Sequence, residues 1–231
     1  MEKVGIIFAM KEELEALKEY LTVEKEYEIF DLKFYEGKIN DLTCVLVESG
    51  IGKVNAARTT QILIDNMKVD YIFNIGVAGG IDASLDVLDV VIADKLVQHD
   101  FDITAFNHEK GYIPNVGTFI ESDNYLLNIA KKLIHDHSCK IGTIASGDIF
   151  CTDILMSNKI NKKFNALAVE MEGASIAQVC FLSHIPFLII RSISDIPGKD
   201  NVLTYDEFLE KSSKKVAHIM NEILKYIDFT K

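Results

Sequence analysis

The chain has 231 residues, of which 48% are apolar and only three are proline, so a disordered chain and a linker-rich array are excluded and one large α/β domain spanning residues 1–231 is expected. Its formal net charge of −11 disfavours binding to nucleic acid and to anionic membrane surfaces, which are themselves negative. No stretch approaches the roughly 18 uninterrupted apolar residues of a membrane-spanning helix.

The first half of the chain alternates strand-like and helix-like segments. Its expected strands share β-rich apolar runs or apolar alternation, and they are residues 4–9, 28–39, 42–47, 71–75 and 87–96. Helical spacing of apolar residues predicts helices over 11–20 and 54–67. Residues 99–119 lack a clear period and contain Gly111 and Pro114, so we expect a long loop there.

The second half continues the alternation. Helices are expected at residues 123–137, where Ser122 can cap the first turn, and at 173–182. A last helix, to about residue 226, is expected to open with the capping-box spacing that begins at Thr204. The strands expected here are residues 141–145, 166–169 and 186–193. Alternating elements with strands that are apolar on both faces predict a sheet covered by helices on both sides.

The four cysteines, Cys44, Cys139, Cys151 and Cys180, include no C-x-x-C pair and no cluster with histidine that would hold zinc. Most of them lie in apolar stretches, where a free thiol packs like a small hydrophobic side chain. Free thiols favour a reducing compartment, and no targeting segment is recognisable, so we expect the protein in the cytoplasm.

Polar or glycine-rich groups follow five of the expected strands. Ligands of such sheets bind beyond the carboxyl ends of the strands, so we expect these groups to line one crevice. They are residues 10–13, 76–80, 146–148, 170–172 and 191–195.

Several of these groups have ordinary structural explanations. The segment GVAGG at 76–80 lacks the G-x-G-x-x-G spacing of a dinucleotide loop, and GIGK at 50–53 lacks the full spacing of a phosphate loop. Glu12 and Glu13 suit the first turn of a helix, where the dipole favours carboxylates. Arg191 is less ordinary, since a charge in a strand that is otherwise apolar on both faces is costly unless it is paired.

Taken together, the carboxylates suit the hydrolysis of a bond to a sugar. One carboxylate can activate water, a second can protonate the leaving group, and a third can accept hydrogen bonds from two neighbouring hydroxyls. The transition state of such a reaction resembles an oxocarbenium ion. Apolar walls would raise the pKa of a carboxyl group so that it can serve as the acid.

Seven segments extend this pattern over nearly the whole chain: GIIFAMKEELEAL (5–17), ESGIGKVNAA (48–57), NIGVAGGID (74–82), HDFDITAF (99–106), SGDIF (146–150), AVEMEGASIAQVC (168–180) and IPFLIIRSISD (185–195). In this order they resemble the 5′-methylthioadenosine/S-adenosylhomocysteine nucleosidases of the nucleoside phosphorylase superfamily. The resemblance implies a three-layer α/β/α sandwich with a central mixed sheet, and a homodimer without metal or organic cofactor. It also implies hydrolysis of an N-glycosidic bond, which releases adenine.

The resemblance implies catalytic roles position by position. Glu13 would be the base that activates water, and Asp195 would be the acid that protonates N7 of adenine. Arg191 would help to position the water, and Ser194 would steady the acid.

It also implies substrate contacts. Glu172 would bind the ribose hydroxyls with Met171 packed against the sugar, while Glu170 would support the turn or reach the ribose edge. Phe150 would stack on the purine, and Cys151 would offer its backbone to the adenine edge. The remaining binding residues are Met10, Ile51 and Tyr205 around the alkylthio tail, Val77 and Gly79 in the 76–80 turn, and Ile103, Phe106, His108 and Pro114 contributed by a second subunit through the 99–119 loop.

Three positions depart from the family pattern without removing a catalytic group. Val77 stands where many relatives have Ser, which removes one polar contact to the water site. His108 and Tyr205 replace other aromatic residues, which alters the expected fit of the tail.

Three other functions stay open. A nucleoside phosphorylase needs cations and amide donors for its phosphate. The first turn here offers Glu12 and Glu13 beside a single Lys11, which favours hydrolysis. A futalosine-type nucleosidase is disfavoured by the apolar residues expected around the tail. A non-catalytic nucleoside binder would need no acid and base pair.

Overall fold

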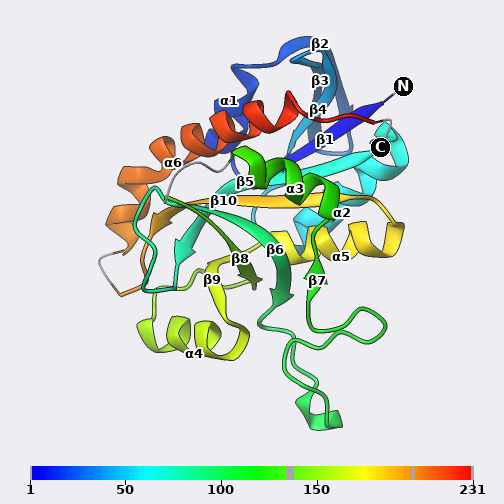
Figure 1. The fold of residues 1–231 in the computed structure, drawn as a ribbon. Coiled ribbons are helices and arrows are strands. Elements are labelled where there is room, and N and C mark those ends of the chain that lie inside the picture. The colour runs from blue at the N-terminus through cyan, green and yellow to red at the C-terminus, as the bar shows by residue number, and fades with distance from the viewer. Residues whose placement is uncertain (1, 134–137, 199–200, 230–231) are drawn as a thin grey trace.

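The computed structural model describes residues 2–133, 138–198 and 201–229, and of residues 201–204 it describes the backbone alone. Within these ranges ten strands form one mixed sheet (Figure 1). They are β1 (Lys3–Phe8), β2 (Thr22–Ile29), β3 (Leu32–Ile39), β4 (Leu42–Glu48), β5 (Tyr71–Gly80), β6 (Val90–Gln98), β7 (Ile120–Glu121), β8 (Cys139–Ser146), β9 (Ala166–Glu170) and β10 (Phe187–Asp195).

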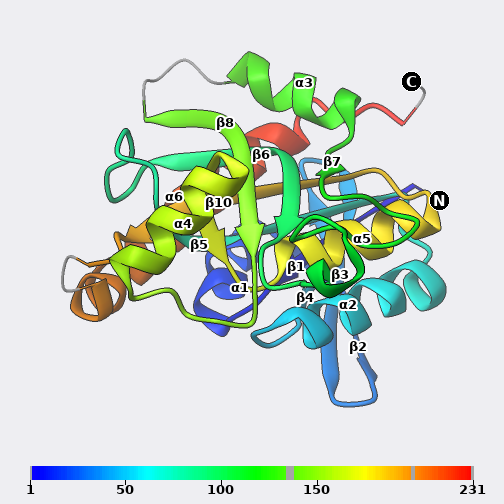
Figure 2. The same ribbon diagram turned by 90° about the horizontal axis from the view of Figure 1, so that it is seen from below.

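Helices cover both faces of this sheet, as the apolar patterning predicts. They are α1 (Lys11–Lys18), α2 (Lys53–Ile62), α3 (Asn124–Leu133), α4 (Ile154–Phe164), α5 (Gly173–Ser183) and α6 (Asn201–Leu224). Side chains alternate along β1: Ile6 and Phe8 pack with α1, α3 and α6, whereas Ile7 joins the cluster under α2 and α5. Figure 2 shows the resulting layers, with α3 on one side of the strands and α2 and α5 on the other. The expected three-layer α/β/α sandwich is confirmed.

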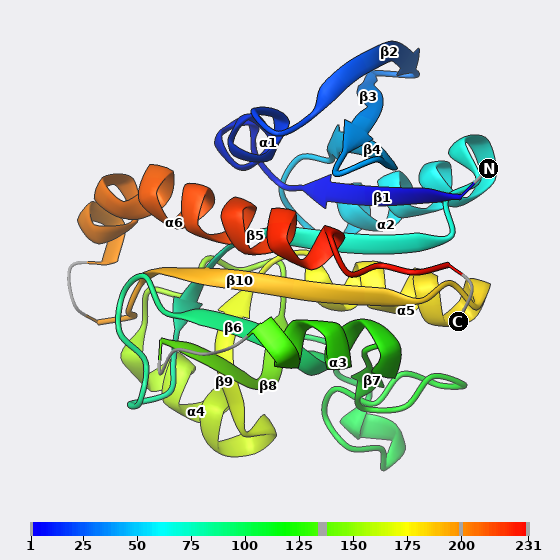
Figure 3. The same cartoon turned by 45° about the horizontal axis from the view of Figure 1, so that its top comes forward.

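Strand β5 is the longest strand at the centre of this arrangement and exchanges one neighbour for another along its length. One edge pairs with β10 in parallel over most of its length. The other edge pairs in parallel with β1 from Tyr71 to Asn74 and then antiparallel with β9 at Gly79 and Gly80. Figure 3 shows β1, β5 and β10 side by side. Residues 75–78 therefore lie between the end of β1 and the start of the β9 pairing, and this opening is where the candidate site forms.

The pairings also close part of the sheet on itself. Strands β5, β10, β6, β8 and β9 pair in a ring, while β1, β4, β3 and β2 extend from β5 to an outer edge at β2. Helix α4 packs on the closed part through Ile160 and Phe164, next to β8 and β9.

The prediction of one strand over residues 28–39 is wrong. The chain turns at Phe30 and Asp31, so that β2 and β3 form a hairpin. Phe30 has φ 57°, a left-handed conformation that glycine or asparagine usually adopts. Because neither residue type occurs there, the sequence contains no ordinary turn signal.

Other boundaries also differ from the expectation. β5 continues beyond residue 75 to Gly80, because glycine-rich residues that look like a turn remain paired with β10. The segment predicted as one helix over 54–67 is α2 followed by a π-helical turn, Leu63–Met67. Helix α6 begins at Asn201, so Thr204 does not open it.

The start of α3 uses a different cap from the one predicted. The Asp123 carboxylate, rather than Ser122, accepts a hydrogen bond from Leu126 N–H at 3.0 Å. The predicted end of this helix, residues 134–137, lies outside the described residues. Helix α4 is not anticipated by the sequence analysis, although Asp153 caps it by accepting from Leu155 N–H at 2.8 Å.

The expected long loop over residues 99–119 is confirmed. It contains one short 3₁₀ turn, Thr104–Phe106, and extends away from the sheet at the bottom of Figure 1. Phe106, with 76% of its surface exposed, lies in this turn.

Candidate active site

One pocket opens at the carboxyl ends of the central strands and encloses about 590 Å³ of non-atom space, its open mouth included. Residues from four of the five groups that the sequence analysis singled out line it, namely 10–13, 76–80, 170–172 and 191–195, although Arg191 itself is not in the wall. No residue of the fifth group, 146–148, lines the pocket, but Ile149, Phe150 and Cys151 directly after it do. Its walls consist of Ala9, Met10, Glu13, Ile51, Val77, Ala78, Gly79, Ile149, Phe150, Cys151, Val169, Glu170, Met171, Glu172, Ser194, Asp195 and Tyr205.

Glu13 reaches the pocket from the first turn of α1 and fills the opening beside β5. Its Oε2 accepts from Ala9 N–H at 2.9 Å and Met10 N–H at 3.1 Å, and its Oε1 accepts from Val77 N–H at 3.0 Å. Val77 lies in the part of β5 that neither β1 nor β9 pairs on that edge, so its amide is available to the carboxylate. Burial raises the pKa of Glu13 above its ordinary value, while Arg191 and these amides oppose the rise.

Gly76 makes this approach of Glu13 and Arg191 possible. A Cβ atom at residue 76 would clash with both Glu13 Oε1, which comes from α1, and Arg191 Nη1, which comes from β10. The glycine is therefore required for close approach of two charged side chains, not for a turn.

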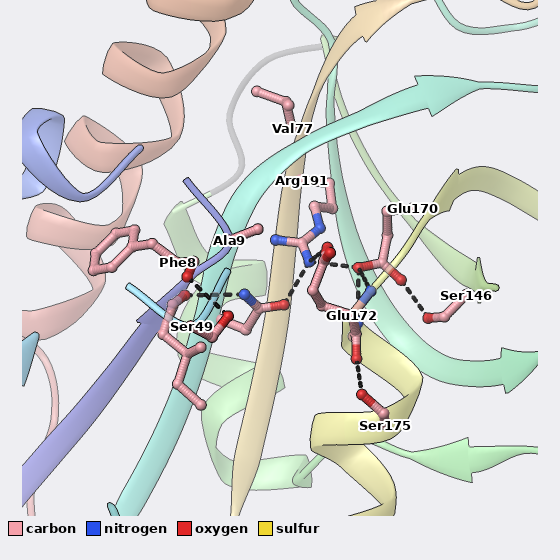
Figure 4. A network of polar contacts seen from close by, with 12 residues as sticks. Phe8, Ala9, Ser49, Val77, Ser146, Glu170, Glu172, Ser175 and Arg191 are labelled. Atoms are coloured by element: carbon pink, nitrogen blue, oxygen red, sulfur yellow. Dashed lines mark hydrogen bonds and ion pairs between the residues drawn. The ribbon is translucent and has the colours of Figure 1, made fainter. Parts of the chain in front are cut away.

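Arg191 is 1% exposed and is paired, as its position in an apolar strand requires. Its Nη2 donates to Asn74 Oδ1 and to Glu170 Oε2, both at 2.5 Å, and lies 3.7 Å from Glu172 Oε2. Its Nε and Nη1 find no hydrogen-bond partner within the described part of the chain. Figure 4 shows Arg191 directed at Glu170 and Glu172. Three N–H groups, one on Nε and two on Nη1, thus remain for a ligand or a water.

Glu170 is satisfied by the protein. Its Oε2 accepts from Arg191 and from the N–H groups of Glu172 (3.0 Å) and Gly173 (2.7 Å), and its Oε1 accepts from Ser146 Oγ. Burial opposes ionisation, but Arg191 and these hydrogen bonds hold the pKa of Glu170 below its ordinary value. Glu170 therefore fixes the turn from β9 into α5, one of the two alternatives left by the sequence.

Glu172 is satisfied only in part. Its Oε1 accepts from Gly52 N–H at 2.8 Å, and among the described residues no hydrogen bond reaches Oε2. Burial and then the neighbouring Glu170 charge raise the pKa of Glu172 to about 8, against the effect of Arg191 and the Gly52 amide. One oxygen of this carboxyl group is left for a ligand.

Asp195 ends β10 and is 1% exposed. Ile193 packs in the core, and the register of β10 against β5 shifts between Ile193 and Asp195. This irregularity changes the direction of the strand end that carries Asp195. Ser194 Oγ donates to Asp195 Oδ1 at 2.8 Å. A Cβ atom at Gly79 would contact Asp195 Oδ2 at 3.4 Å, so this oxygen lies over the glycine. Ser194 thus holds one oxygen of this carboxyl group in place.

Apolar and aromatic side chains form the mouth of the pocket. Phe150, 45% exposed, meets Tyr205 edge-on with ring centroids 5.6 Å apart, and Tyr205 Oη lies 2.9 Å from Met10 Sδ. Ile51 is 53% exposed at the same mouth. Cys151 and Met171 line the wall.

Four of the expected binding residues do not line the pocket of their own chain: Ile103, Phe106, His108 and Pro114. Phe106, His108 and Pro114 are exposed on the 99–119 loop, and His108 stacks on Tyr112 with ring centroids 4.6 Å apart. Their placement leaves them available to a second subunit.

Some residues of the site escaped the sequence analysis. Asn74 holds Arg191, and Ile149 lines the pocket. Asn74 carries a signal that could have found it, since a polar side chain interrupts the buried apolar run of β5 just as Arg191 interrupts β10.

The described residues offer neither a cluster of metal-binding side chains nor a membrane-spanning helix. No group of three His, Cys, Asp or Glu side chains in this part of the chain is placed to hold a metal ion. None of its helices is both long and apolar enough to cross a membrane.

Comparison with known proteins identifies the family. A sequence model of the Phosphorylase superfamily matches residues 3–225. The 5′-methylthioadenosine/S-adenosylhomocysteine nucleosidase of Staphylococcus carnosus is 41% identical over 225 residues, which cover 96% of this chain and 99% of the relative.

Solved structures agree with this match. The nucleosidase of the same name from Helicobacter pylori, in complex with butyl-thio-DADMe-Immucillin-A, superposes with a TM-score of 0.94 at 36% identity and covers 98% of this chain and 99% of its own. A futalosine hydrolase of Helicobacter pylori superposes with a TM-score of 0.94 at 35% identity and covers 98% of each chain. The chain belongs to the 5′-methylthioadenosine/S-adenosylhomocysteine nucleosidase family of the phosphorylase superfamily.

Proposed function

We propose that this chain hydrolyses the N-glycosidic bond of 5′-methylthioadenosine and of S-adenosylhomocysteine, releasing adenine and the corresponding thioribose product. One observation carries the proposal. Two buried carboxyl groups, Glu13 and Asp195, enter the same pocket from the ends of β1 and β10, on either side of the unpaired stretch of β5. A nucleoside bound between them would have a base on its sugar side and an acid on its purine side.

Glu13 serves as the base for water. Three amide N–H groups hold its two oxygens, so its orientation is fixed before substrate binds. Burial raises the pKa of Glu13 toward neutral pH, which makes its carboxylate a better proton acceptor. Arg191 Nη1, which has no hydrogen-bond partner among the described residues, lies over Gly76 beside it and can hold the attacking water.

Asp195 serves as the acid for the purine. Ser194 donates to Oδ1, which leaves the proton on Oδ2, the oxygen over Gly79. Transfer of that proton to N7 lets adenine depart without a full negative charge. Phe150 would stack on the purine at the mouth, and the backbone of Cys151 would meet its edge.

Glu172 binds the ribose. Its Oε2 faces the pocket and can accept hydrogen bonds from vicinal hydroxyls, while Gly52 N–H steadies Oε1. These contacts strengthen as positive charge develops on the sugar, so they lower the barrier as well as KM. Met171 packs against the sugar, and Met10, Ile51 and Tyr205 surround the tail.

The distribution of charge favours water over phosphate as the nucleophile. Glu13, Glu170 and Glu172 surround Arg191, and a phosphate beside them would meet net repulsion. The first amides of α2 are occupied as well, because Gly52 N–H donates to Glu172 and Lys53 N–H donates to Asp148. The GIGK segment therefore binds carboxylates of its own chain, not phosphate.

Three coarser expectations accompany the proposal. We infer a homodimer in which Ile103, Phe106, His108 and Pro114 complete the neighbouring pocket. The buried thiols of Cys44 and Cys180 fit a reducing cytoplasm. One domain over 1–231 is supported by a single sheet whose strands run from β1 to β10.

A second candidate function is hydrolysis of a futalosine-type substrate, favoured by the futalosine hydrolase among the similar structures. The apolar mouth formed by Met10 and Ile51 suits a thioether tail better than a bulky polar one. Comparing the two substrates at equal concentration separates the candidates.

The test is release of free adenine from 5′-methylthioadenosine by the purified protein in phosphate-free buffer, with Glu13→Gln as the inactive control. We expect turnover that added phosphate does not increase. Turnover that requires phosphate would identify a phosphorylase, and binding of the nucleoside without adenine release would identify a non-catalytic paralogue.

A further inference from the structure

Three loops at the edge of the pocket are joined in a closed ring of hydrogen bonds through Lys53, Asp100 and Asp148. Lys53 Nζ donates to Asp100 Oδ1 at 2.7 Å, and Asp148 N–H donates to Asp100 Oδ2 at 3.0 Å. Lys53 N–H, at the first turn of α2, donates to Asp148 Oδ1 at 2.8 Å. The Lys53 and Asp100 side chains are 18% and 21% exposed, so this pair is partly shielded from solvent.

Each arm of the ring is adjacent to a pocket element. Gly52, the residue before Lys53, donates the amide hydrogen bond to Glu172 Oε1. Asp148 directly precedes Ile149 and Phe150 in the pocket wall. A shift of the α2 end or of the 146–148 turn would therefore move the ribose carboxylate or the purine wall.

The Lys53 side chain also reaches α5, the helix that Glu172 precedes. Lys53 Nζ donates to Gln98 Oε1 at 3.1 Å, and Gln98 Nε2 donates to Gln178 Oε1 at 2.7 Å within α5. Glu172 is thus tied to Lys53 by two routes, through the Gly52 amide and through the helix that begins after it.

Lys53 is the only positively charged residue of the three in the ring, so the ion pair in the ring depends on it. Lys53 joins both aspartates, since its ammonium group pairs with the Asp100 carboxylate and its backbone N–H donates to the Asp148 carboxylate. Burial raises the pKa of Asp100, but the Lys53 hydrogen bond and the Asp148 amide outweigh it and leave this pKa below the ordinary value. Without the ammonium group, the partly buried Asp100 carboxylate would lose its ion-pair partner and keep only the Asp148 amide.

We propose that Lys53 is a positioning residue for the reaction: by closing this ring it holds the Gly52 amide, and through it the Glu172 carboxylate, in the orientation that accepts the ribose hydroxyls. The inference rests on the proposed function, in which Glu172 binds ribose. It adds a residue outside the pocket wall that acts on Glu172 mainly through the hydrogen bond from Gly52 N–H.

The test is a double-mutant cycle on adenine release. Lys53→Met should lower kcat/KM for 5′-methylthioadenosine about tenfold, with part of the loss in kcat, because sugar contacts tighten in the transition state. In the Glu172→Gln background the same substitution should change kcat/KM less than about twofold, because the group it positions is already lost. Lys53→Arg should restore most of the wild-type value.

Matched variants separate positioning from general stability. Lys214→Met removes an exposed ion pair on α6 with Glu210 and should leave kcat/KM unchanged. Lys53→Gln keeps a donor and removes the charge, so it replaces Lys53→Met if that protein does not fold. A melting temperature for each variant shows whether the fold persists.

Two results would overturn the inference: equal losses from the Lys53 substitution with and without Glu172, or a loss below about twofold in the wild-type background. Failure of the proposed function has a different signature, since the unmodified protein would then release no adenine in the same assay.

Discussion

At the inner wall of the pocket the protein fully satisfies the Glu170 carboxylate, whereas at the mouth it leaves apolar side chains exposed. The Glu170 carboxylate on the inner wall accepts four hydrogen bonds from Arg191, Ser146 and two backbone amides. At the mouth, Ile51 and Phe150 are about half exposed. The hydrogen bonds of Glu170 thus stabilise the fold, whereas the exposed apolar surface of the mouth is available to a ligand or a second chain.

The contrast also separates two carboxylates that are two residues apart. Glu170 has lost its freedom to bind a ligand, and its pKa is lowered by its partners after burial has opposed them. Glu172 keeps one oxygen for the pocket and has a raised pKa. A carboxylate that the protein leaves unsatisfied at this depth costs stability, and function is the reason to retain it.

The largest effect is expected from Asp195→Asn. The amide cannot give a proton to N7, so kcat should fall by about 10³-fold or more, at the upper range for loss of a general acid. Adenine release measures this, and the melting temperature should stay near that of the wild type because Ser194 can still donate to the amide oxygen. A rate within tenfold of wild type would remove Asp195 from the acid role.

Next in size is the difference between Glu170→Ala and Glu172→Ala in stability. Glu170→Ala leaves a buried guanidinium without its main partner and should cost about 3–5 kcal/mol in the free energy of unfolding. Glu172→Ala should cost much less, since it removes a carboxyl group repelled by Glu170. Urea unfolding measures both. Equal losses would mean that the two carboxylates support the fold alike.

The sequence predicted the convergence of strand ends because each signal was local: a polar residue where an apolar strand should end. Arg191, Glu172 and Asp195 all carry that signal. The pairings that open the site are not local. Along one edge of β5 the paired strand changes from β1 to β9, and the β9 residues that pair with it are about 90 residues further along the chain. No pattern within residues 71–80 encodes this change.

Local signals also explain why the turn at Phe30 and the start of α6 were predicted wrongly. Phe30 turns the chain without a glycine because Arg58, from α2, packs on its ring 5.5 Å from the centroid and pairs with Asp31. Tertiary contacts therefore support a turn that local propensity does not specify. Helix α6 starts ahead of Thr204, so its capping-box spacing is coincidental.

A smaller effect is expected in the pH dependence of stability. The pKa of Glu172 is raised from 4.5 to about 8, so between these values the folded protein holds a proton that the unfolded chain has lost. The contribution of Glu172 to the free energy of unfolding is therefore greatest below pH 4.5 and falls as pH rises toward 8, by on the order of 1 kcal/mol per pH unit.

Glu172→Gln removes this titration, and Glu13, whose pKa is also raised, titrates in both proteins. Unfolding both in urea from pH 5 to pH 8 should therefore show the wild type losing stability relative to the variant. A difference that stays constant over this range would place the Glu172 pKa near its ordinary value.

The smallest effect is expected from Phe106→Ala in the exposed 99–119 loop. Phe106 is 76% exposed, so its removal should leave the melting temperature unchanged, yet it should raise KM for 5′-methylthioadenosine by up to about tenfold if it completes the pocket of a second subunit. The KM of a nucleoside without the thioether tail should not change. Phe30→Ala is the matched control, since Phe30 is 77% exposed on the β2–β3 turn, away from the pocket. If the two alanine variants behave alike, one chain forms the whole mouth, and the exposed loop is not part of the site.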